Sequence, residues 1–214
     1  LDILNTFYNE KSFYGTKKYL RNLNKKILPN DYLEKLYNYA TNEIFIDIAR
    51  NYLKEEPLLA ELNLVLSPAS LENSEKEYEG SQCWHSDFDD TKILKFFIYL
   101  DDVSEDNGPL QVIPKNITKR ILDEKNYIWG GNKSHDDAIY PKESNGYSNM
   151  ISGKGSIIIA DTVNCLHRGS RNVRKRRILL IASFYTKTSF RYTPINWLLP
   201  KPFSDYILNL SSPL

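Results

Sequence analysis

"SQCWHSDFDDTKILKFFIYL" (residues 81–100) places a His-x-Asp pair directly before a run of strand-forming residues. Side chains alternate between the two faces of an extended chain, so His85 and Asp87 are expected to point the same way. The apolar and aromatic residues 92–100 are typical of a buried or half-buried strand. An imidazole and a carboxylate on one face form either a surface pair or two-thirds of a metal site. The remainder of the chain must supply the third ligand.

Helical patterns precede this stretch, and short β-rich segments surround it. Residues 17–28 and 30–56 carry apolar side chains at helical spacing, with Leu33, Ile44 and Ile48 on the expected buried face. The predicted strands are residues 61–68, 81–88, 92–100, 107–114, 153–162 and 176–186. Helices followed by many short strands predict a mostly β fold with flanking helices, built on a jelly-roll (double-stranded β-helix, cupin-like) core.

The chain of 214 residues reads as a single domain. A helical part of about residues 1–57 precedes a core of about 60–186, and an apolar C-terminal tail is expected to pack back onto the body. Residues 115–126 have the pattern of a further helix. The polar segment 129–148, with Trp129 and His135, is expected to form a binding loop or lid, because long structureless segments are unusual in compact domains.

Composition excludes several classes of function. Hydrophobic residues make up 41% of the chain, as in an ordinary globular protein. The 28 basic residues nearly balance the 27 acidic ones, so the net charge creates no electrostatic field that would attract nucleic acid. The basic run 167–177 is interpreted as a solvated turn between strands. No apolar run long enough to span a bilayer and no signal-peptide pattern is found, so no membrane partner is expected. Only two Cys residues suggest a cytoplasmic location.

The third ligand candidate is His167, in "GSIIIADTVNCLHRGS" (residues 155–170). Two histidines and one carboxylate form the facial triad that suits Fe(II) and leaves positions open for a cosubstrate and oxygen. A jelly roll fits this spacing, because one strand brings His85 and Asp87 while a distant strand brings His167. Arg177 then opens the next apolar strand.

These motifs together resemble the phytanoyl-CoA dioxygenase-like family, which includes ectoine hydroxylase. "WHSDF", "NGPLQVIP", "GSIIIADTVNCLHRGS" and the strand opened by Arg177 occur in the order and approximate spacing of that family, over about residues 60–186. Two features depart from the family pattern. The position two residues after the second histidine is Gly169 followed by Ser170, where relatives carry Ser or Thr, and "PKNI" replaces the usual "PGSH" after the Gly-Pro strand.

The resemblance implies a role for each matching residue. His85, Asp87 and His167 match the iron ligands, and Arg177 matches the arginine that pairs with the far carboxylate of 2-oxoglutarate. Lys95 and Ser170 fall near positions where relatives place polar contacts to this cosubstrate. Strand parity puts Arg177, Leu179 and Ile181 on one face, and an error of one residue in the register would put Arg176 there instead.

The resemblance also implies a reaction. Iron, 2-oxoglutarate and O2 together would hydroxylate an aliphatic C–H bond of a small molecule, with release of succinate and CO2. Because halogenating relatives lack the carboxylate, Asp87 favours hydroxylation. The oligomeric state and the substrate are not readable from the sequence.

Two alternatives remain open at this point. A catalytically silent jelly-roll protein would keep the fold and a small-molecule or metal site, although it would have no chemical reason to keep Arg177 and all three ligands. Cys83 and Cys165 each lie two residues before a candidate histidine, so a structural zinc site is the second alternative. The likelier role of both thiols is that of small buried residues.

Overall fold

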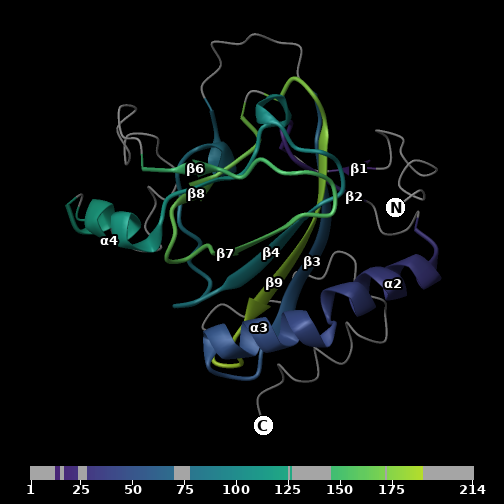
Figure 1. Cartoon of the computed structure of the whole chain (residues 1–214), viewed down its shortest axis with the longest axis horizontal. Helices are drawn as coiled ribbons and strands as arrows, with labels where there is room; N and C mark the ends of the chain where they lie inside the picture. The colour runs from purple at the N-terminus through teal and green to yellow at the C-terminus, as the bar shows by residue number, and fades with distance from the viewer. Residues whose placement is uncertain are drawn as a thin grey trace.

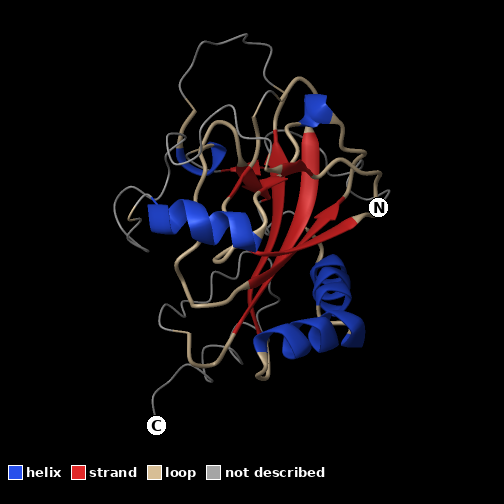
Figure 2. Ribbon diagram, turned by 60° about the vertical axis from the view of Figure 1, so that its left-hand side comes forward, coloured by secondary structure: helices blue, strands red, loops and turns tan. Residues whose placement is uncertain are grey.

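Two antiparallel sheets and three α-helices make up the described part of the molecule (Figures 1 and 2). The computed structural model describes residues 13–14, 17–23, 28–69, 78–124, 126, 146–171 and 173–189. Trp129, His135 and the C-terminal tail, with the predictions made for them, lie outside these residues. Within the described ranges, no helix combines the length and apolar character that a membrane crossing requires.

The larger sheet has the strand order β1-β2-β3-β9-β4-β7, and the smaller one the order β6-β5-β8. Every pairing of neighbouring strands is antiparallel. The strands of the larger sheet are β1 (Phe13–Tyr14), β2 (Arg21–Leu23), β3 (Leu58–Ser67), β9 (Arg177–Tyr185), β4 (Leu94–Tyr99) and β7 (Ile157–Asp161). Those of the smaller sheet are β6 (Ser148–Asn149), β5 (Gln111–Val112) and β8 (His167–Arg168).

The helices α2 (Asn30–Ala40) and α3 (Glu43–Leu53) lie against the outer face of the larger sheet (Figures 1 and 2). The helix α4 (Lys115–Glu124), where one was predicted, packs beside the smaller sheet through Ile121. The mostly β architecture with flanking helices is therefore confirmed.

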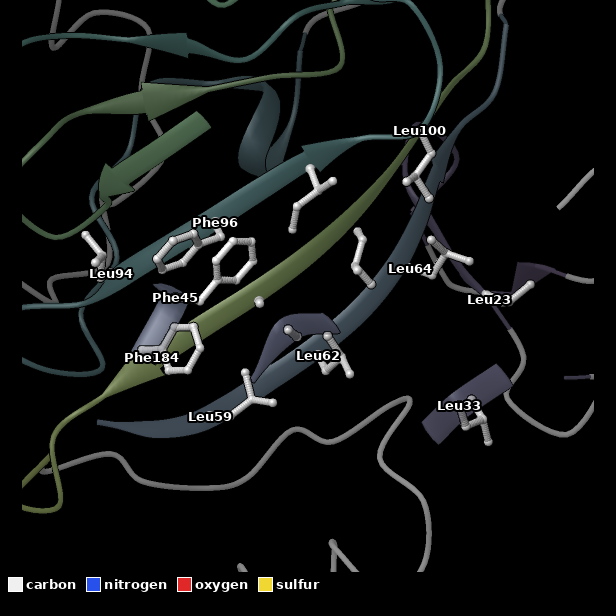
Figure 3. Close-up of a cluster of buried hydrophobic side chains, with 14 of the residues drawn as sticks. Leu23, Leu33, Phe45, Leu59, Leu62, Leu64, Leu94, Phe96, Leu100 and Phe184 are labelled. Atoms are coloured by element: carbon white, nitrogen blue, oxygen red, sulfur yellow. The ribbon is translucent and has the colours of Figure 1, made fainter. Parts of the chain in front are cut away.

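The outer face of the larger sheet forms the main hydrophobic core with α2 and α3 (Figure 3). Phe96 of β4 is fully buried, with its ring stacked 4.5 Å from that of Phe45 in α3 and 5.5 Å from that of Phe184 in β9. Alternate residues of the same strands point to the opposite, inner face, so one sheet carries both the core and the wall of a cavity. The outward residues of β3 and β9 in this core are Leu62, Leu64, Leu66, Ile178, Leu180, Ala182 and Phe184.

The N-terminal prediction was wrong in two places. Residues 17–28 were expected to be helical, but Arg21–Leu23 pair with β3 as a strand. The buried face expected for the part of residues 30–56 that forms α3 was also wrong, since Ile44 is 70% exposed and Phe45 is buried.

A helix break explains the second error. The two helices are separated at Thr41 and Asn42, and the Asn42 side chain caps the second one by accepting from the Phe45 amide at 3.1 Å. The break resets the helical phase, so the buried positions after it cannot be derived by continuing the spacing of those before it.

A third correction concerns the opening motif. Residues 81–88 were predicted as a strand, but a short 3-10 helix, η3 (Gly80–Gln82), occupies their start. The chain after it is irregular and pairs with β8 through an isolated antiparallel bridge between His85 and His167. Extended backbone at this bridge is enough to keep His85 and Asp87 on the same side.

Replacing Phe96 with alanine should destabilise the protein by about 3–5 kcal/mol, because it removes a buried ring from between Phe45 and Phe184. Urea unfolding followed by circular dichroism measures this change. The matched control is Ile44→Ala, which should stay within about 0.5 kcal/mol of the unsubstituted protein because that side chain is mostly exposed. Equal effects of the two substitutions would contradict the packing described.

Candidate metal centre and its cavity

The three predicted metal ligands meet between the two sheets. One ligand atom from each of His85, Asp87 and His167 lies within 4.8 Å of the other two. His167 Nε2 is 3.9 Å from Asp87 Oδ1. Within the parts of the chain that the structure describes, no other group of histidine, cysteine and acidic side chains converges in this way. The arrangement provides two nitrogen ligands and one oxygen ligand for a single ion.

Backbone hydrogen bonds aim the two imidazoles at each other. The amide of His85 donates to the His167 carbonyl at 3.1 Å, and the amide of His167 donates to the His85 carbonyl at 2.9 Å. The ring centroids are consequently 4.1 Å apart. Each Nδ1 also lies close to the carbonyl oxygen two residues earlier, at 2.9 Å for Cys83 and 3.1 Å for Cys165. A carbonyl can only accept, so Nδ1 carries the proton and Nε2 is the unprotonated nitrogen that can bind a metal.

The two cysteines serve this site through their carbonyls and not through their sulfur atoms. The Cys83 thiol is buried and donates to the Tyr78 carbonyl at 3.1 Å. Burial raises the pKa of the Cys165 thiol to about 11, so at neutral pH it is not the thiolate that zinc prefers. Neither cysteine belongs to the converging group. The structural-zinc alternative therefore has no support in the geometry.

Asp87 is held as a carboxylate by its neighbours. Its Oδ2 lies 2.8 Å from Lys95 Nζ, inside the cavity. Burial by itself would raise the pKa of Asp87, but the Lys95 ammonium and the His167 and His85 imidazoles outweigh burial and keep that pKa well below its usual range. Lys95 was predicted to contact a cosubstrate. In the structure it lines the cavity and lies against the Asp87 carboxylate, and the cosubstrate contact stays a prediction.

Arg177 reaches the cavity from the first position of β9. It is 4% exposed and lines the cavity together with Leu179 and Ile181, which is the face that strand parity assigns to it. The side chain of Arg176 is 37% exposed and lies 3.9 Å from Asp101 Oδ2. The structure thus brings Arg177, and not Arg176, into the same cavity as the three ligands.

The Arg177 guanidinium is held at one end and free at the other. Nη2 donates to Ser170 Oγ at 3.0 Å and to Ser67 Oγ at 3.3 Å, and the two hydroxyls are 2.8 Å apart. Nε and Nη1 are buried and have no hydrogen-bond partner among the described residues. No carboxylate forms an ion pair with Arg177 in that part of the chain. Ser170 was predicted as a cosubstrate contact, and in the structure it contacts the guanidinium.

The buried Arg177 guanidinium has the charge and the hydrogen-bond donors of an anion-binding site. Burial lowers the pKa of Arg177 to about 10, which still leaves it charged at neutral pH. A buried charge is costly unless it is paired and its donors are satisfied. A ligand carboxylate that enters the cavity would supply the opposite charge and an acceptor for these donors.

The cavity has a volume of about 300 Å³. All six residues singled out from the sequence line it, namely His85, Asp87, Lys95, His167, Ser170 and Arg177. Sequence reasoning missed the inward residues Glu61 and Asn63 of β3. The available signal was a polar residue at alternate positions of an otherwise apolar strand. The buried Asn63 Oδ1 has no hydrogen-bond partner in the described residues, so this carboxamide is available to a ligand.

Comparisons with known proteins agree with this architecture. No family model matches the sequence, so the phytanoyl-CoA dioxygenase-like assignment stays a prediction. The chain is 25% identical over 190 residues to a probable alpha-ketoglutarate-dependent hypophosphite dioxygenase from Stutzerimonas stutzeri. This match covers 82% of the chain but only 61% of that relative.

Solved structures share the fold at low sequence identity. The alpha ketoglutarate dependent epimerase SnoN from nogalamycin biosynthesis matches 87% of this chain and 70% of its own, with a TM-score of 0.55 and 14% identity. HygX from Streptomyces hygroscopicus matches 82% of this chain and 74% of its own, with a TM-score of 0.52 and 10% identity. EctD from S. alaskensis matches 92% and 70%, with a TM-score of 0.50 and 16% identity. The jelly-roll core is confirmed.

Two substitutions in the segment that carries the second histidine test the assignment of ligands. His167→Ala should weaken binding of Co(II), used as an air-stable probe, by at least about 100-fold, because it removes one of three ligands. Cys165→Ala should leave the affinity nearly unchanged, because the Cys165 carbonyl and not its sulfur supports the site. Titration followed by visible absorption measures both affinities. A strong loss in the cysteine variant would restore the zinc interpretation.

Proposed function

We propose that this protein is an Fe(II)- and 2-oxoglutarate-dependent dioxygenase that hydroxylates an aliphatic C–H bond of a small molecule and releases succinate and CO2. The observation that carries the proposal is the pairing of two features in one cavity. A two-histidine, one-carboxylate ligand set shares the cavity with Arg177, a buried cation whose Nε and Nη1 have no hydrogen-bond partner among the described residues. Each feature alone is common, whereas their combination suits a metal-binding dicarboxylate.

The residues present fit iron. Two neutral imidazoles and one carboxylate on one side of an ion are the ligand set typical of non-haem Fe(II) oxygenases. Bound iron supplies the oxygen chemistry that no side chain provides. The chain contributes His85 and His167 in fixed tautomers and Asp87 in its ionised form. Its carboxylate occupies the position that a halide would need, which favours hydroxylation.

The residues also fit 2-oxoglutarate. The planar guanidinium of Arg177 is a permanent cation whose Nε and Nη1 can each donate a hydrogen bond to a ligand oxygen. Ser67 and Ser170 hold Nη2, so the guanidinium is already oriented when the ligand arrives. The curated relative is described as alpha-ketoglutarate-dependent, and SnoN has been solved in complex with Fe3+ and alpha ketoglutarate. These relatives support the same cosubstrate here.

The cavity favours a compact substrate. Its volume of about 300 Å³ must accommodate 2-oxoglutarate as well. Apolar side chains such as Phe88, Phe97 and Ile181 line it beside Asn63, whose carboxamide offers a hydrogen bond. We therefore propose a small molecule with an aliphatic portion and at least one polar group.

The deciding experiment is anaerobic. Fe(II) and then 2-oxoglutarate are added to metal-free protein, and a visible charge-transfer band is expected only when both are present. In Arg177→Leu the band should require at least about 30 times more 2-oxoglutarate, since truncating one partner of a buried charge pair costs 2 kcal/mol or more. The matched control is Arg176→Leu, whose exposed side chain lies outside the cavity and whose loss should not change the affinity.

Oxygen then separates an enzyme from a binding protein. Admission of air to the loaded protein should convert 2-oxoglutarate to succinate, and a substrate from a panel of small polar compounds should accelerate the conversion. A silent jelly-roll protein would form the band and leave 2-oxoglutarate intact. Absence of the band, or an equal loss in the two arginine variants, would overturn the proposal itself.

A further inference from the structure

An irregularity in β3 turns an acidic residue into the cavity. Leu59 pairs with Phe184, and Glu61 pairs with the adjacent Ser183, so Ala60 has no partner across the ladder. Residues two apart in a regular strand share a face. Here Leu59 packs in the outer core while Glu61 lines the cavity, because the bulge shifts the alternation by one residue. Bulges of this kind re-aim side chains next to functional sites.

Glu61 belongs to a row of polar residues that crosses three strands. In the sheet register, Ser183 of β9 lies opposite both Glu61 of β3 and Lys95 of β4. Ser183 Oγ donates to Glu61 Oε2 at 2.7 Å, and Lys95 Nζ is 3.8 Å from the same oxygen. Lys95 Nζ is also 2.8 Å from Asp87 Oδ2. The ammonium therefore lies between a carboxylate of the sheet and the carboxylate of the metal centre.

We propose that Lys95, held by Glu61, is a positioning residue for the metal carboxylate. By engaging Oδ2 of Asp87, it leaves Oδ1 as the oxygen that faces the imidazoles, 3.9 Å from His167 Nε2. The carboxylate is thereby set to bind through one oxygen, so that the other does not occupy a position meant for a ligand. This inference rests on the proposed metal site and concerns how that site is oriented.

Charge and geometry make opposite predictions for Lys95. A fixed positive charge next to a divalent cation repels it, so charge alone predicts that Lys95 weakens metal binding. If Lys95 orients a metal ligand, it should strengthen metal binding, because partners of metal ligands typically contribute 10–100-fold to affinity. The sign of the change on removing the ammonium therefore tells the two roles apart.

The experiment is a Co(II) titration of the full-length metal-free protein, followed by visible absorption. Lys95→Met should weaken Co(II) binding by about 10-fold or more even though it removes a repulsive charge. It should also change the shape of the Co(II) ligand-field bands, which loss of stability alone would not do. Lys95→Arg should recover part of the affinity. Lys119→Met, on the exposed surface of α4, is the matched control and should change nothing.

A double-mutant cycle tests the part assigned to Glu61. If Glu61 acts through Lys95, Glu61→Gln should weaken Co(II) binding less than Lys95→Met does, and the double variant should bind as Lys95→Met does. Additive losses would show that Glu61 acts independently. If Lys95→Met fails to fold, Glu61→Gln still decides the question, because an unchanged affinity and band shape in that variant would overturn the proposal.

Asp87→Ala separates this inference from the proposed function. If the unsubstituted protein does not bind Co(II), or if Asp87→Ala binds it equally well, the metal site itself is wrong. If Asp87→Ala loses binding while Lys95→Met binds as tightly as the unsubstituted protein or more tightly, only the positioning role is wrong.

Discussion

The reciprocal backbone hydrogen bonds between His85 and His167 are the constraint on which the candidate site depends. They connect an irregular segment to β8, two parts of the chain that are far apart in sequence. The same bridge brings the two ring centroids to 4.1 Å with the ring planes tilted by 49°, while the carbonyls of Cys83 and Cys165 fix which nitrogen of each ring carries the proton. Without this bridge, no local property of the sequence would bring the two imidazoles within reach of one ion.

Charges in the cavity are arranged unequally. Around Asp87 they are balanced, since Lys95 contacts that carboxylate and lies near Glu61. Around Arg177 they are not, since the hydroxyls of Ser67 and Ser170 contact it, the Tyr99 hydroxyl lies beside it, and no carboxylate pairs with it among the described residues. The balanced side keeps the ligand carboxylate ionised and oriented. Arg177, on the unbalanced side, carries the unsatisfied hydrogen-bond donors to which a dicarboxylate would bind.

Much of this was readable from the sequence. Alternation along β9 put Arg177, Leu179 and Ile181 on one face of the strand, since a strand has a period of two, and the resemblance to a known family favoured this face as the inner one. The helical part was less readable. Its failure at Ile44 and Ile48 arose at Asn42, where a cap restarted the helix in a new phase, and the strand at Arg21–Leu23 was decided by pairing with β3 rather than by its own propensity.

By itself, the sequence determined the type of core, and it named His85, Asp87, His167 and Arg177 as candidate site residues through the His-x-Asp pattern, strand alternation and the resemblance to a known family. Only the tertiary structure decided the partners of these groups. The bulge at Ala60 directs Glu61 inward, Lys95 meets Asp87, and Ser170 meets Arg177. Asp87 and Ser170 lie outside the strands and Glu61 follows a bulge, so these contacts depend on sheet register and on the closing of one sheet over the other, which no local pattern records.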